Sequence, residues 1–191
     1  MVTPVSALLL ASGRGVRFDP SGVRSKLAAT LPDGRSVLRA SAQTLRSVIE
    51  SVVVVVPAEH DQLLDALEGL DVRVVVNARA AEGMGTSIAC GVRELANAPG
   101  WLIALADMPF VAAATLRALA ESLARGASIV APVFEGQRGH PVGFAASHFE
   151  ALARLEGDVG ARSILSNATV HLVEVSDSGI LRDIDRPGDL F

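Results

Sequence analysis

The chain has 191 residues, of which half are hydrophobic and a fifth are charged, and its formal net charge is −4. This composition excludes a disordered chain and predicts one domain with a large buried core, for which we expect the bounds 1–191. The negative charge argues against wholesale binding to nucleic acid or to an acidic membrane. A single cysteine excludes an internal disulfide bond, and no apolar run approaches the roughly 20 residues of a membrane span, so we expect a cytoplasmic protein.

Up to residue 134, apolar runs that predict strands alternate with amphipathic segments that predict helices. We expect strands at 5–10, 52–56, 72–76, 101–106 and 128–134, and helices at 36–50, 63–70, 84–96 and 112–125. The strand segments are apolar almost throughout, which indicates cover on both faces. The fold class that follows is α/β, with a three-layer, doubly wound, mostly parallel sheet and helices on both faces. After residue 134 the pattern changes to a hairpin-like turn, short helices and a last strand at 169–175.

The loop after the first strand is rich in small and basic residues. It begins with Ala11, Ser12, Gly13, Arg14 and Gly15, and continues through Arg17 and Arg24 to Lys26, the only lysine of the chain. Small residues let backbone N–H groups approach an anion and the cations neutralise it, so this loop is a candidate phosphate site. Phe18 stands where the dinucleotide fingerprint has its third glycine, and the P-loop motif is also missing.

Three more polar segments follow predicted strands, at the edge where an open parallel sheet binds its ligands. Asp107 suits a hard cation such as Mg²⁺, or it caps a helix before Pro109. Asp185 lies in the C-terminal tail, apart from these strand ends. It is either a second metal ligand or part of a group that caps a final helical turn. The segment 83–87 opens a helix that favours anions, or is an ordinary capped turn. His140 alone is more typical of a structural or solvated histidine than of a catalytic one.

Six segments, in order along nearly the whole chain, resemble one family. They are LLLASGRGVRF with Lys26, Asn77 with GMGTS, LALADMPFV, GQRGHPVGF, LEGDVGAR and DIDRPGDL. The chain is similar to the molybdenum cofactor nucleotidyltransferases, especially the cytidylyltransferases, within the nucleotide-diphospho-sugar-transferase-like superfamily. Ser12 and Ala106 depart from the family's usual alanine and glycine. The stretch from Arg17 to Lys26 is longer than usual.

The resemblance implies transfer of a nucleoside monophosphate from an NTP to the phosphate of a molybdopterin-type cofactor, with release of pyrophosphate. It implies CTP or GTP as donor, with CTP favoured because the guanylyl-type Leu-Ala-Gly-Gly is missing. The resemblance assigns roles to individual residues of this chain. Catalysis falls to Arg17, Lys26 and Asp107, nucleotide binding to Ala11, Ser12, Gly13, Arg14, Gly15, Asn77 and Ser87, acceptor binding to Arg138, Gly139, His140, Asp158 and Arg162, and Mg²⁺ binding to Asp107 and Asp185.

Three alternatives remain open from the sequence. The first keeps the reaction but uses another phosphate acceptor, such as a sugar phosphate. The second is a nucleotide- or cofactor-binding accessory protein that serves a molybdenum enzyme, motivated by the long Arg17–Lys26 stretch. The third is a dinucleotide-dependent oxidoreductase. It is disfavoured by the missing third glycine and by Pro57 and Ala58, which stand where an acidic residue would follow the second strand.

Overall fold

A computed structural model describes residues 5–13, 15, 17–21 and 24–191 of the chain. Within these residues eight strands form one sheet, with the order β3-β2-β1-β4-β7-β5-β6 and with β8, off this path, also paired to β5. The strands are β1 (Ser6–Leu10), β2 (Val52–Pro57), β3 (Arg73–Asn77), β4 (Gly100–Leu105), β5 (Ile129–Phe134), β6 (Gln137–Arg138), β7 (Val142–Ala145) and β8 (His171–Glu174). The helices are α1 (Val37–Arg46), α2 (Asp61–Leu67), α3 (Met84–Glu94), α4 (Ala113–Ala124), α5 (Phe149–Ala153) and α6 (Arg162–Ser166).

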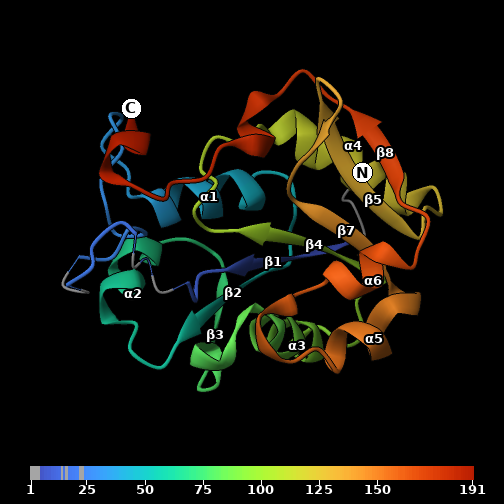
Figure 1. Cartoon of the computed structure of the whole chain (residues 1–191), viewed down its shortest axis with the longest axis horizontal. Coiled ribbons are helices and arrows are strands. Elements are labelled where there is room, and N and C mark those ends of the chain that lie inside the picture. Colours follow the sequence, from blue (N-terminus) through green and yellow to red (C-terminus); the bar gives the residue numbers. More distant parts are fainter. Residues whose placement is uncertain (1–4, 14, 16, 22–23) are drawn as a thin grey trace.

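The helices cover both faces of the sheet, with α1 and α4 on one side and α3 and α5 on the other (Figure 1). Alternate strand residues supply the two cores: Val54 and Leu9 pack on the α1 side, whereas Val53 and Leu8 pack on the α3 side. Because successive side chains of a strand point to opposite faces, a strand of five valines is buried on both. The predicted three-layer, doubly wound fold is therefore confirmed.

The parallel part of the sheet comprises β3, β2, β1 and β4, whose carboxyl ends share one edge. The second half of the chain departs from this order. A two-residue turn at Glu135 and Gly136, both at positive φ, returns β5 into β6, and β7 then runs antiparallel between β4 and β5. The sheet is thus mixed, although its site-bearing half is parallel.

Helix α1 starts as predicted but ends earlier. The Ser36 hydroxyl accepts a hydrogen bond from the Arg39 N–H and caps the first turn. The helix ends at Arg46 rather than near residue 50, because Val48 N donates to the Leu45 carbonyl three residues back and tightens the chain into a turn. Among the described residues, no helix has the length and apolarity required to cross a bilayer.

Candidate active site

A two-part cleft lies at the carboxyl edge of the parallel strands. Its larger part, about 830 Å³, extends from the loop after β1 past the start of α2. Its smaller part, about 330 Å³, lies between Lys26 and Asp107 on one wall and Gly83, Met84 and Asp158 on the other. Both parts are lined by Ser12, Gly13, Lys26, Leu27, Ala80 and Ala81, so they form one continuous cleft.

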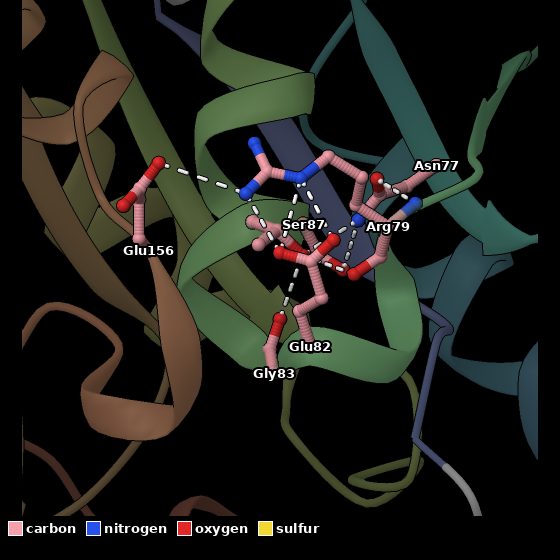
Figure 2. A network of polar contacts seen from close by, with 7 residues as sticks. Asn77, Arg79, Glu82, Gly83, Ser87 and Glu156 are labelled. Carbon is pink, nitrogen blue, oxygen red and sulfur yellow. Dashed lines mark hydrogen bonds and ion pairs between the residues drawn. The ribbon is translucent and has the colours of Figure 1, made fainter.

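A hydroxyl and amide network joins the β1 loop to the start of α3. The Asn77 amide is buried and donates to Thr86 Oγ1 and Ser87 Oγ, each at 3.0 Å. Ser87 Oγ in turn lies 2.7 Å from Ser12 Oγ. Asn77 Oδ1 accepts the Arg79 N–H at 3.0 Å, which completes the polar contacts of this amide (Figure 2). The predicted nucleotide residues Ser12, Asn77 and Ser87 are therefore brought into contact across 75 positions of sequence.

Arg79 lies beside this network and was not predicted from the sequence. Its guanidinium forms an ion pair with Glu82 at 2.7 Å and approaches Glu156 at 3.6 Å, as Figure 2 shows. The Glu82 carboxylate, with a smaller effect from Glu156, raises the pKa of Arg79. About half of the Arg79 side chain is exposed, so these pairs contribute little stability. They connect the segment after β3 with the segment that precedes Asp158.

The start of α3 packs backbone to backbone against residues 156–158. A Cβ on Gly83 would lie 2.3 Å from the carbonyl carbon of Gly157, and one on Gly85 would lie 2.7 Å from the Glu156 oxygen. Gly83 also has φ 129°, a conformation that L side chains rarely adopt. Glycine is thus required here to hold Asp158 against the helix and in the wall of the cleft.

Lys26 is buried among carboxylates. Its ammonium lies 2.6 Å from Asp107 Oδ2 and 3.4 Å from Asp185 Oδ1, and 9% of its side chain is exposed. Arg17 reaches Asp185 from the solvent side at 2.6 Å. The three predicted catalytic residues and the predicted second metal ligand thus form one charged cluster.

The carboxylates of Asp107, Asp183 and Asp185 form a set in which one oxygen atom of each residue lies within 4.8 Å of those of the other two. The Ile184 N–H donates to the Asp107 carbonyl at 2.8 Å and holds the C-terminal segment beside the end of β4. Desolvation raises the pKa of Asp183 above its ordinary value, and the carboxylates of Asp185 and Asp107 add to the rise. Three hard oxygen donors that repel one another suit a divalent cation, so the residues fit the predicted metal.

Sequence reasoning missed Asp183 as a member of this set. The signal was present: in an extended segment, residues two apart share a side, so Asp183 and Asp185 point together while buried Ile184 points away. The final helical turn is capped by Asp189, whose carboxylate accepts the Asp185 and Arg186 N–H groups.

The predicted acceptor residues include one in the cleft lining and a second group in which His140 lies near enough to Arg138 and Arg162 to feel their charges. Asp158 lines the cleft, whereas Arg138, Gly139, His140 and Arg162 are outside the described lining of both parts. His140 is near enough to Asp107 to feel its charge. Partial desolvation lowers the pKa of His140, Asp107 opposes this effect, and Arg138 and Arg162 reinforce it. Neutral imidazole is thus favoured at this position.

The glycine-rich turn after β1 is described in part. Gly15 has φ 60°, and a Cβ there would lie 3.4 Å from Lys26 Cγ, so its backbone packs on the lysine stem. Ala11 is buried behind the turn, and Gly13 is exposed at the cleft. Arg14, a predicted nucleotide residue, lies outside the described residues.

The chain is similar in sequence and in fold to known proteins. The MobA-like NTP transferase domain matches residues 7–174. The chain is 30% identical to nicotine blue oxidoreductase of Paenarthrobacter nicotinovorans, over 98% of this chain and 95% of that protein. It is 26% identical to a nucleotidyl transferase from Methanothermobacter, with a TM-score of 0.80 over 97% of this chain and 93% of that one.

Mycobacterium tuberculosis Rv0371c has a similar structure, with 26% identity and a TM-score of 0.79 over 97% of this chain and 95% of that one. Rv0371c was also solved as a complex with manganese, at a TM-score of 0.73 and the same coverage. The fold, the carboxyl-edge cleft and the matched residues lead to one conclusion. This chain belongs to the MobA-like NTP transferase family and is a nucleotidyltransferase.

Proposed function

We propose that residues 1–191 act as one nucleotidyltransferase domain. In this proposal the enzyme transfers a nucleoside monophosphate, CMP in preference to GMP, to the terminal phosphate of a molybdopterin-type cofactor. The observation that carries it is the contact of Lys26, which lines both parts of the cleft, with the carboxylates of Asp107 and Asp185. We propose that a molybdenum enzyme receives the product.

The larger part of the cleft is our proposed site for the nucleoside, and the smaller part for the acceptor phosphate. An acceptor phosphate oxygen attacks the α-phosphorus of the NTP, and the bond from that phosphorus to the oxygen bridging to the β-phosphate breaks. Pyrophosphate leaves with the bonding electrons. The acceptor itself is the nucleophile, so positioning and charge neutralisation carry the catalysis.

Each residue of the site has one task in this mechanism. Ser12, Asn77 and Ser87 orient the nucleoside end of the donor. Lys26 and Arg17 neutralise the triphosphate and the departing pyrophosphate. The carboxylates of the C-terminal segment and of Asp107 would hold a divalent cation, for which we propose Mg²⁺.

When bound, that cation supplies positive charge that offsets the negative charge developing on the phosphates. The manganese complex of Rv0371c supports a divalent ion in this fold. For this chain, the three adjacent carboxylates support the same assignment.

The test is pyrophosphate release from CTP, GTP and ATP, each with Mg²⁺ or Mn²⁺, in the presence and absence of molybdopterin-type cofactor. We expect release that requires the cofactor and a divalent ion and that is fastest with CTP. Asp107→Asn should lower kcat at least ~100-fold, whereas Glu121→Gln, a charge removed on the outer surface of α4, should leave it unchanged. Full turnover by Asp107→Asn would refute the assigned metal role, and NTP binding without release would favour an accessory protein.

A second candidate rests on the whole-length similarity to nicotine blue oxidoreductase. In that case the same cleft would hold a dinucleotide and transfer reducing equivalents. Oxidation of NADH or NADPH in the presence of nicotine blue, followed at 340 nm, separates the two. Oxidation that persists in Asp107→Asn, with no pyrophosphate release from any NTP, would favour the oxidoreductase.

A further inference from the structure

Among Lys26, Arg17, Asp107 and Asp185, the side chain of Lys26 is the least exposed to solvent. The backbone of Gly15 packs on its stem, and the ammonium is directed at Asp107 Oδ2 and Asp185 Oδ1. Arg17, the other cation of the cluster, has 72% of its side chain exposed and, within the part of the chain that the structure describes, forms its ion pair with Asp185. Solvent therefore screens the arginine, whereas it barely screens the lysine.

These contacts use the carboxylates that a divalent cation needs. Asp107 and Asp185 belong to the set of three in which one oxygen atom of each residue lies within 4.8 Å of those of the other two, and Lys26 bonds to both. A compact unit positive charge at hydrogen-bond distance from two ligands repels a cation that approaches the same ligands. Lysine and metal are thus competitors for one anionic site.

The cleft offers the ammonium a second position. Lys26 lines both the 330 Å³ part and the 830 Å³ part of the cleft, next to Ser12 and Gly13. A lysine has a flexible four-carbon stem and three donors, so its head can move from a carboxylate to a phosphate without movement of the backbone. A triphosphate beside the turn after β1 would supply such an oxygen.

We propose that Lys26 is an internal counter-ion that holds Asp107 and Asp185 against a divalent cation until the triphosphate draws the ammonium away. This inference rests on the proposed nucleotidyltransferase function. Metal and nucleotide then bind with positive coupling, and by linkage each raises the affinity for the other by the same factor. The enzyme therefore takes up little free metal ion and binds metal together with NTP.

The first experiment uses the wild-type protein. Because Lys26 is the only lysine, labelling with ¹⁵Nζ-lysine gives one side-chain signal that needs no assignment. We expect Mg²⁺ to shift this signal saturably, with the same midpoint as the heat of Mg²⁺ binding, and NaCl of equal ionic strength to leave it unchanged. A signal that stays in place while Mg²⁺ binds would overturn the competition.

The second experiment measures Mn²⁺ affinity without nucleotide, from the electron paramagnetic resonance signal of free Mn²⁺. Lys26→Met should bind Mn²⁺ at least ~10-fold more tightly than wild type, because the competing charge is gone. Arg24→Met removes a cation from the same loop that touches Asp19 and not the carboxylate set, and should match wild type. Equal or weaker binding by Lys26→Met overturns the inference.

These experiments distinguish a failure of the lysine–metal competition from a failure of the proposed nucleotidyltransferase function. A gain of Mn²⁺ affinity in Lys26→Met together with a wild-type protein that releases no pyrophosphate supports the competition and refutes the proposed function. Normal pyrophosphate release by the wild type without that gain refutes the competition alone. If Lys26→Met does not fold, judged by circular dichroism, the labelled wild-type titration still decides.

Discussion

The substitution Gly85→Ala tests whether contact between backbones positions the proposed acceptor side of the cleft. Gly85 lies in the first turn of α3, and a Cβ there would meet the Glu156 oxygen at 2.7 Å and the Gly157 oxygen at 2.9 Å. Ordinary carbon–oxygen contacts begin at about 3.3 Å, so the helix and the segment that bears Asp158 must separate by about 0.5 Å. Both obstacles are backbone atoms, which cannot rotate aside.

Two energies of opposite sign compete in this variant. Alanine is about 1 kcal/mol better than glycine within a helix, whereas overpacking costs about 1–3 kcal/mol. We expect a net loss of about 1 kcal/mol, or a fall in Tm of about 2–4 °C for a chain of this size. Because small misplacements near the reacting groups lower rates steeply, kcat/KM for the acceptor should fall about 10- to 100-fold while KM for the NTP changes little.

Gly91→Ala in the same helix is the matched control. Its Cβ would meet side-chain methyl groups of Leu8 and Val55 at 2.9 Å, away from the cleft, so stability should change and acceptor kinetics should not. Steady-state kinetics with varied acceptor and thermal melts of both variants make the comparison. Unchanged acceptor kinetics in Gly85→Ala would refute the view that this close packing positions Asp158.

Three more substitutions test separate parts of the site and its support. Asn77→Ala removes both contacts to hydroxyls and should raise KM for the NTP at least ~10-fold, measured by steady-state kinetics; an unchanged KM would exclude Asn77 from nucleotide binding. Asp177→Ala removes the carboxylate that accepts the Ala112 N–H at 2.8 Å and caps α4 from a distant segment, so unfolding should become easier by about 1–2 kcal/mol, and an unchanged Tm would contradict this role. Hydrogen bonds from Ser21 and from the Arg24 backbone lower the pKa of Asp19 from 3.8 to about 2, so its stabilisation is present above pH ~4 and is lost as the pH falls toward 2. Denaturant melts should therefore show wild type more stable than Asp19→Asn at pH 6 and equal to it near pH 2; a difference that persists at pH 2 would contradict this assignment.

The parallel half of the sheet can be predicted from the local pattern of apolar and polar residues. Each apolar run from β1 to β4 is flanked by polar residues and amphipathic helices, and right-handed crossovers then place Ser12, Asn77 and Asp107 at one edge. The antiparallel β7 could not be found in this way. Its residues pair with β4 on one side and with β5 on the other. This pairing depends on contacts with other strands, which the local hydrophobic pattern does not show.

For the site, the residues that end the strands and the chemistry they bring can be predicted from local sequence, because turn residues, capping groups and charges are local properties. Which of these residues contact one another depends on the folded structure. Lys26 meets Asp107 and Asp185 across 81 and 159 positions, and Asp183 joins them through a backbone bond between Ile184 and Asp107. Contacts of such separation depend on how the C-terminal segment packs across the edge of the sheet, and that packing is a property of the folded chain as a whole.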